Sequence, residues 1–159
     1  MSSRHVLEAA VSGEQGSQEV RQAAMELDAA LEERDTERVV ACFSEDCEIE
    51  LLGVRLAGRE GARKWLGWFF HHVASIRFEP VTVLVQGSTF FEEFVAHATL
   101  WDGTEVDSRQ AEVLLFEGVK VKSLRLYFDR LDFGRSFAGN PLRRALLRRL
   151  AKASLKGLE

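Results

Sequence analysis

Apolar residues recur at helical spacing in three segments of the N-terminal half of the chain. The first predicted helix spans residues 18–34, and the second is a short helix that Thr36 can cap. The third spans residues 59–74 and has the widest apolar stripe. The apolar positions of the three are Val20, Ala23, Ala24, Leu27 and Leu31; Val39, Val40 and Phe43; and Ala62, Trp65, Leu66, Phe69, Phe70 and Val73.

Alternation of apolar and polar residues predicts strands in the rest of the chain. A first strand is expected over residues 47–52, followed by a short connection over 53–58. Four longer runs follow, over 75–85, 89–101, 105–116 and 119–129, with hairpin signals at 86–88 and 102–103. This order predicts an α+β fold, in which a cone-shaped, curved antiparallel sheet wraps on the three N-terminal helices and leaves a pocket between them.

The two ends of the chain differ from the middle. Residues 1–17 are polar and are predicted to be a flexible segment, residues 18–137 form the α+β domain, and residues 138–159 form an amphipathic basic helix opened by Asn140-Pro141. Leu142, Leu146 and Leu150 lie on one stripe of that helix. We favour packing of this helix against the acidic body of the protein. The alternatives are contact with a membrane surface or a partner protein, and a mobile lid over the mouth of the cone.

The amino-acid composition and net charge exclude several classes of protein. The 159 residues are 46% hydrophobic and 29% charged, which is typical of one globular domain and excludes a disordered or fibrous chain. The net charge of −4 includes the basic C-terminal segment, so the rest of the chain is strongly acidic and is not expected to bind nucleic acid. No signal peptide or membrane span is recognisable, and Cys42 and Cys47 read as reduced thiols, so a cytoplasmic protein is expected.

Three short motifs carry a family resemblance. They are Cys-Phe-Ser-Glu-Asp at 42–46, Ala-Gly-Arg-Glu-Gly at 57–61 and Leu-Tyr-Phe-Asp-Arg-Leu at 126–131. In their order and spacing, residues 19–135 resemble the nuclear-transport-factor-2-like superfamily, within it the SnoaL-like polyketide cyclases and limonene-epoxide hydrolases. The resemblance implies chemistry without a cofactor and a homodimer through the outer face of the sheet, where Val113, Leu115, Arg125 and Tyr127 are expected.

The resemblance also shows where this chain departs from its relatives. The functional positions of the epoxide hydrolases fall on Glu93, Val95, Leu126, Ile49 and Leu51, and none of them has the hydrolase residue. The base of the ketosteroid isomerases matches Leu51 and their oxyanion-hole tyrosine falls near Leu27, whereas their protonated acid matches Glu112. The acid/base aspartate of the SnoaL-like cyclases falls at or near Leu126. Epoxide hydrolysis of the limonene type is therefore not expected.

Strand alternation selects the candidate catalytic residues. If Val95 faces the pocket, then Glu93 and His97 share its face, and Glu112 lies on the neighbouring strand. Glu93, His97 and Glu112 are the predicted catalytic residues, because burial raises the pKa of a carboxyl group toward the range useful for acid–base chemistry. A slip of one residue would turn Glu92 and Ala96 inward instead, and Ala111, Val113 and Leu115 are an equally good inward set for the strand of Glu112. The other predicted pocket residues are Leu27, Asp28, Leu31, Ile49, Leu51, Trp65, Leu66, Phe69, Val73, Phe78, Phe91, Val95, Gln110, Leu124, Leu126 and Phe128.

Two hypotheses for function follow. In the first, the protein binds a small apolar polyketide-, terpenoid- or steroid-like carbonyl compound and acts on it as an isomerase, cyclase or lyase without a cofactor. In the second, it is a non-catalytic ligand-binding or dimerisation module with the same fold. No metal site is expected, because the adjacent His71 and His72 point about 100° apart on a helix.

Overall fold

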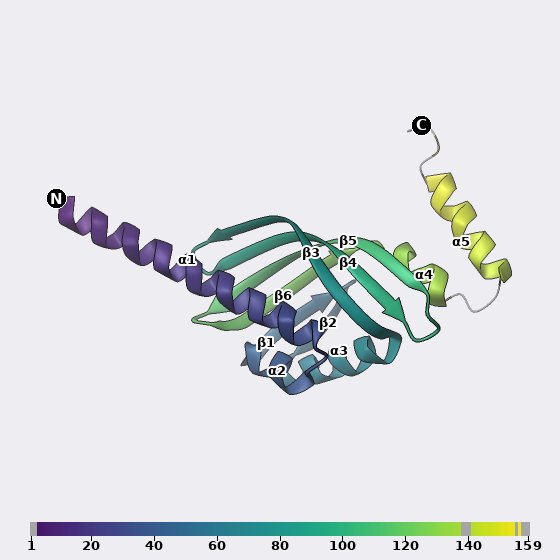
Figure 1. Ribbon diagram of the computed structural model, residues 1–159, viewed down its shortest axis with the longest axis horizontal. Coiled ribbons are helices and arrows are strands. Elements are labelled where there is room, and N and C mark those ends of the chain that lie inside the picture. Colours follow the sequence, from purple (N-terminus) through teal and green to yellow (C-terminus); the bar gives the residue numbers. More distant parts are fainter. Residues whose placement is uncertain (1–2, 138–140, 155, 157–159) are drawn as a thin grey trace.

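The computed structural model describes residues 3–137, 141–154 and 156. The helices are α1 (Ser3–Glu32), α2 (Thr36–Cys42), α3 (Gly58–His72), α4 (Arg130–Phe137) and α5 (Pro141–Ser154). The strands are β1 (Phe43–Leu51), β2 (Val54–Ala57), β3 (Val73–Gln86), β4 (Thr89–Leu100), β5 (Glu105–Glu117) and β6 (Lys120–Phe128). They form one curved sheet in the order β2-β1-β6-β5-β4-β3 (Figure 1).

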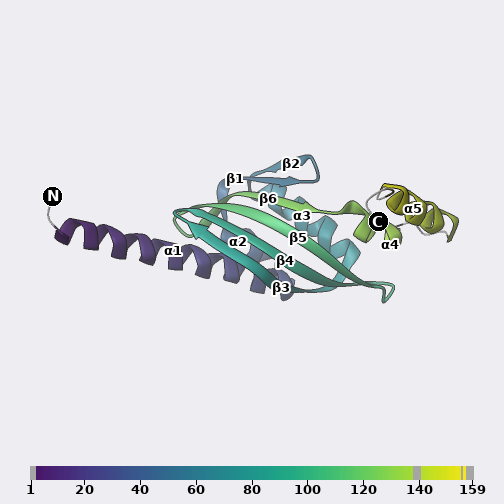
Figure 2. The same ribbon diagram turned by 90° about the horizontal axis from the view of Figure 1, so that it is seen from above.

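The predicted α+β architecture is confirmed, with one difference in strand pairing. The strands from β3 to β6 form the expected antiparallel meander, but β1 pairs with β6 in parallel, so the sheet is mixed. Figure 2 shows that the curved sheet covers α2 and α3 and that α1 runs along the side of β3. Buried side chains of the three helices and of the inner sheet face form the main core. Its largest fully buried members include Leu27, Phe43, Ile49, Leu66, Leu114 and Leu124.

The first two sequence motifs meet at the start of α3. Gly58 has a φ of +66°, and a Cβ atom there would lie 3.1 Å from the carbonyl oxygen of Glu45. Only glycine adopts this conformation at so close an approach without strain. The next residue, Arg59, donates through Nε and Nη2 to the carbonyl oxygen of Phe43, at 3.2 and 3.1 Å. The motifs therefore join the beginning of β1 to the beginning of α3.

Several local elements differ from the sequence predictions. The expected connection over 53–58 contains β2, because Leu52 and Gly53 adopt positive φ and turn the chain back on β1. Asp35 rather than Thr36 caps α2, since its carboxylate accepts from the backbone N–H of Arg38 at 3.0 Å. The helix α1 begins at Ser3 rather than at residue 18. The unpredicted helix α4 follows Asp129, whose carboxylate accepts from the N–H of Leu131 at 2.8 Å.

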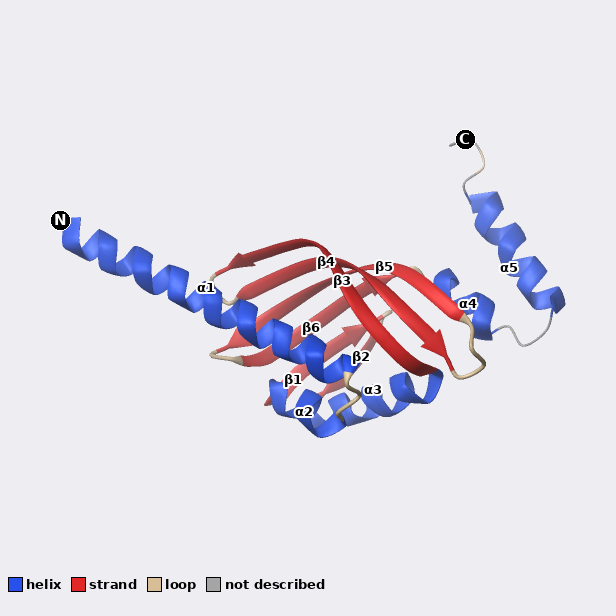
Figure 3. Ribbon diagram, in the orientation of Figure 1, coloured by secondary structure: helices blue, strands red, loops and turns tan. Residues whose placement is uncertain are grey.

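The basic helix α5 begins at Pro141 as predicted, whereas Asn140 and the domain boundary at residue 138 lie outside the described residues. The helix contacts α4 and stands apart from the sheet in Figure 3. Leu142, Leu146 and Leu150 are 76%, 57% and 57% exposed, so the leucine stripe is not packed against the body as the sequence favoured. None of the helices in the described ranges is long and apolar enough to cross a bilayer.

Candidate ligand-binding site

The register of β4 decides which side chains face the helices. Along this strand the even-numbered residues from Phe90 to Leu100 are buried, and the odd-numbered ones are only partly buried. Glu92 is 3% exposed and faces inward with Phe94 and Ala96. The predicted inward face of Phe91, Glu93, Val95 and His97 is therefore wrong, and the alternative register, which turns Glu92 inward, is the one adopted.

The physical reason lies in the composition of the two faces. The inward face holds Phe90, Glu92, Phe94, Ala96, Ala98 and Leu100, in which Glu92 is the single polar side chain. On the outer face, Glu93 pairs with Arg109 at 3.1 Å. Also on that face, His97 lies 2.7 Å from Asp107 and 3.2 Å from Glu79. Glu93 and His97 are thus satisfied by partners on neighbouring strands and stand away from the space between sheet and helices.

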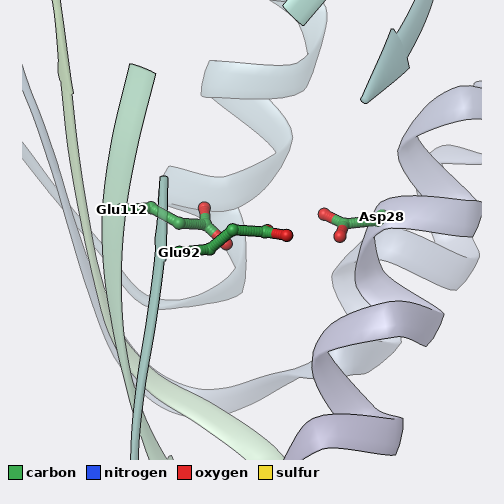
Figure 4. Close-up of side chains that lie close together, drawn as sticks. All are labelled: Asp28, Glu92 and Glu112. Carbon is green, nitrogen blue, oxygen red and sulfur yellow. The ribbon is translucent and has the colours of Figure 1, made fainter. Parts of the chain in front are cut away.

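Three carboxyl groups meet on the inner side of the sheet instead. Asp28 comes from α1, Glu92 from β4 and Glu112 from β5, and their ligand oxygens all lie within 4.8 Å of one another. Glu92 and Glu112 are direct partners across the β4–β5 ladder, and Figure 4 shows Asp28 reaching toward both from the opposite wall. Glu112 is 7% exposed, so its strand has the register expected for it. We call these residues the carboxyl cluster.

Two contacts at the end of α1 hold Asp28 over the sheet. Glu32, one turn later, accepts a hydrogen bond from the backbone N–H of Phe78 on β3 at 2.7 Å. Arg34 donates to the carbonyl oxygens of Phe70, at 3.2 Å, and Val73 at the end of α3. These contacts tie α1 to both β3 and α3, so the position of Asp28 relative to the two strand carboxyls is set by the fold.

Burial raises the pKa of every member of the carboxyl cluster, and mutual repulsion adds to the rise for Asp28 and Glu112. Burial, followed by the charges of Glu92 and Glu32, raises the pKa of Asp28 to about 8. Burial and then the charges of Asp28 and Glu92 hold the pKa of Glu112 well above its ordinary value. Burial also raises the pKa of Glu92. No ion pair among the described residues includes these three carboxyl groups, so neighbouring cations do not offset the effect.

The carboxyl cluster opens into a cavity of about 480 Å³, to which Asp28, Gln110 and Glu112 contribute polar groups. Most of the remaining wall is aromatic or aliphatic. Of the residues expected around a pocket, Asp28, Leu31, Leu51, Trp65, Phe69, Val73, Phe78, Gln110, Leu124, Leu126 and Phe128 line this cavity. Leu27, Ile49 and Leu66 are fully buried in the core instead, and Phe91 and Val95 lie on the outer sheet face.

The prediction missed other residues of the cavity wall. They are Leu52, Val54, Leu56, Lys64, Trp68, His72, Ile76, Phe94, Arg130 and Phe133. Phe133 belongs to α4, which is held to the sheet by a hydrogen bond from Ser108 Oγ to Asp132 at 2.8 Å. Its ring meets that of Phe128 edge-on, with centroids 5.6 Å apart. The unpredicted helix α4 thus supplies part of the cavity wall.

Comparison with known proteins identifies the family. The sequence profile of the SnoaL-like domain matches residues 24–124, well over half of the chain and all three members of the carboxyl cluster. The chain belongs to the SnoaL-like domain family. No curated protein matches the chain at significant similarity.

Several solved structures have the same fold as this SnoaL-like domain. An NTF2-like protein of unknown function from Burkholderia pseudomallei is 19% identical with a TM-score of 0.67, over 74% of this chain and 95% of its own. A putative isomerase from Bacillus subtilis is 16% identical with a TM-score of 0.67, over 77% and 95%. The epoxide hydrolase/cyclase-like enzyme SalBIII, described for pyran ring formation in the polyether salinomycin, is 21% identical with a TM-score of 0.66, over 74% and 96%.

The polar groups of this SnoaL-like cavity only partly match the positions that the resemblance implied. Leu51 and Leu126, the positions at which the resemblance places a base or an acid, are apolar and line the cavity. The carboxyl groups come from α1, β4 and β5, and of these only Glu112 on β5 lies at a position that the resemblance assigns to an acid. Of the three predicted catalytic residues, only Glu112 reaches the cavity, and Glu92 and Asp28 are the acids beside it.

Proposed function

We propose that this SnoaL-like protein binds a small apolar carbonyl compound and catalyses proton transfer on it without a cofactor, as an isomerase or cyclase does. The observation that carries the proposal is the carboxyl cluster at the wall of an otherwise apolar cavity. A cavity of this size and polarity suits a small polyketide-, terpenoid- or steroid-like molecule. Neighbours of the same fold include a putative isomerase and a cyclase-like enzyme.

The protonation states assign a role to each acid. Glu112, whose pKa burial holds well above its ordinary value, carries the proton and donates a hydrogen bond to the carbonyl oxygen of the ligand. Asp28, with a pKa of about 8, is ionised in part near neutral pH and takes a proton from the carbon next to that carbonyl. The electron pair of the broken C–H bond moves to the oxygen, and Asp28 returns the proton to the same or a conjugated carbon. The charge of Glu92 raises the pKa of both Asp28 and Glu112 and so favours their protonated forms.

Proton exchange at a ketone tests the proposal. 1-Tetralone in D₂O, followed by NMR, is expected to exchange its α-protons faster with the protein than with buffer. Glu112→Gln and Asp28→Asn should each remove the acceleration, because a carboxamide neither donates the same hydrogen bond nor accepts the proton as a base. Glu93→Gln is the matched control, since this residue lies on the outer face next to Glu92 and should leave the rate unchanged. Binding of 1-tetralone without faster exchange would instead identify a non-catalytic binder.

A further inference from the structure

The carboxyl cluster has more hydrogen-bond acceptors than binding of one carbonyl compound requires. Three carboxyl groups converge within 4.8 Å, and Glu92 and Glu112 are 3% and 7% exposed. A fourth polar side chain, Gln110, is 7% exposed, lines the same cavity two residues from Glu112, and has no hydrogen-bond partner among the described residues. The amide of Gln110 is therefore available to bond to a ligand in the cavity.

We infer that this cavity binds a primary ammonium ion carried on an apolar body, with the nitrogen held among Asp28, Glu92 and Glu112. An ammonium group has three N–H donors, and the cluster offers one carboxyl group to each of them. The side-chain oxygen of Gln110 is a further acceptor at the same wall. The positive charge compensates the repulsion among the three acids, which no basic side chain does in the described ion pairs.

The rest of the cavity fits the apolar body of such a ligand. Rings of Trp65, Phe69, Phe78 and Phe94 line it, and Phe78 and Phe94 meet edge-on with centroids 5.4 Å apart. Aromatic faces attract cations as well as apolar groups. The basic side chains on the wall, Lys64 and Arg130, are exposed residues and are not among the electrostatic neighbours that shift the pKa of the cluster.

A divalent metal ion fits the cavity less well than an ammonium ion. Calcium takes six to eight oxygen ligands, and magnesium keeps several bound waters. Beyond the cluster and Gln110, the neighbouring cavity wall consists mainly of aromatic and aliphatic side chains. Such side chains can neither coordinate the metal ion nor hydrogen-bond to the water molecules that it keeps. An alkylammonium ion needs only the three acceptors and places its hydrocarbon part against that wall.

This inference rests on the proposed function for the location of the cavity and extends it to a second class of ligand. An ammonium ion in the cluster occupies Asp28, assigned to proton transfer, and Glu112, assigned to the hydrogen bond to the carbonyl oxygen. Apolar amines are therefore expected to compete with ketones and to inhibit the exchange reaction.

Matched rigid probes test the inference by calorimetry on the full chain at pH 7. 1-Adamantanamine and 1-adamantanol have the same hydrocarbon cage and differ in the polar group. We expect the amine to bind about tenfold to hundredfold more tightly than the alcohol, because its hydrogen bonds to the cluster are charge-assisted. Glu112→Gln and Glu92→Gln should each remove this preference while leaving the affinity for the alcohol, and Glu93→Gln should retain the preference. Binding of the amine should also release protons, seen as a heat that depends on the buffer.

The other outcomes distinguish failure of the inference from failure of the proposed function. Equal or tighter binding of 1-adamantanol, with exchange of 1-tetralone still accelerated, refutes the ammonium assignment and leaves the proposed function standing. Tight amine binding that persists in both Gln variants, once circular dichroism shows them folded, places the amine elsewhere and refutes it too. Binding of Ca²⁺ that depends on Glu112, without binding of the amine, replaces the ammonium ion with a metal. Amine binding without exchange supports the inference and refutes the proposed function.

Discussion

The substitution Asp28→Asn is predicted to stabilise the protein at neutral pH and to leave its stability unchanged in acid. In the folded protein Asp28 retains its proton up to a pH of about 8, whereas in the unfolded chain its carboxyl group ionises near its ordinary pKa of 3.8. Between these values the folded state binds one more proton than the unfolded state, so the free energy of unfolding falls as the pH rises. An asparagine of the same shape does not ionise and does not incur this loss.

The size of the effect follows from the shift. Each unit of pKa difference corresponds to about 1.4 kcal/mol, and pH 7 lies about three units above the ordinary pKa of an aspartate, which sets an upper limit of about 4 kcal/mol. Asp28 is only partly buried and faces the cavity, so water there screens part of the cost. We therefore expect Asp28→Asn to raise the free energy of unfolding by about 2 kcal/mol at pH 7. Its loss also relieves the repulsion that Glu112 experiences.

Urea denaturation of wild type and variant from pH 4 to pH 8 measures this difference. The gain should grow with pH and be smallest near pH 4, where the aspartate is about half protonated even in the unfolded chain. Glu93→Gln serves as the control for removal of a carboxyl group from the same sheet, and its profile should run parallel to that of wild type. A gain of equal size at pH 4 and pH 7 would refute the assignment of a raised pKa to Asp28, as would a loss of stability at both.

Three further predictions concern the packing, capping and assembly of the fold. Trp65→Ala should lower the free energy of unfolding by about 3–5 kcal/mol in urea denaturation, because the ring packs between Phe43 and Phe69; a loss below about 1 kcal/mol would contradict this packing. Asp35→Ala should cost about 1 kcal/mol in the same assay through loss of the α2 cap, Asp35→Asn should cost less, and equal costs would argue against capping. We propose a homodimer through the outer sheet face, where Tyr127 is 54% exposed, so light scattering should give a dimer mass that Tyr127→Glu reduces to a monomer; a monomeric wild type would refute it.

The helices and the meander could be predicted because each depends on a local pattern. The apolar stripe of α3 repeats every three or four residues and marks the helix. The hairpins are marked by Gly87 and Gly103, which adopt the positive φ that a tight turn requires. The strand β2 could not be predicted in the same way, since its four residues, Val-Arg-Leu-Ala, are too few to establish an alternating pattern. Its formation depends on the reversal at Leu52 and on pairing with β1.

The site was harder to predict because a shift of one residue in the register exchanges the two faces of a strand. Both faces of β4 contain a glutamate, Glu92 or Glu93, and both contain phenylalanine. The count of polar side chains on each face distinguishes them, since the outer face also carries His97 and Thr99. The sequence prediction started from an inward-facing Val95 and therefore selected the wrong face. The proximity of Asp28 to the strands is a long-range contact that no pattern along α1 reveals.

The energetic cost of the carboxyl cluster is itself an argument that the cluster serves a ligand. Burying carboxyl groups that lack a counter-charge destabilises a fold, and apolar residues of similar volume would fill this space at lower cost. The neighbouring positions Leu51, Leu124 and Leu126 show that this cavity wall accommodates such residues. The carboxylates on the outer face, by contrast, have partners, as Glu93 has in Arg109. Violations of local stability rules concentrate at functional sites, so the position of this cluster at the wall of a cavity supports the proposal that it binds a ligand.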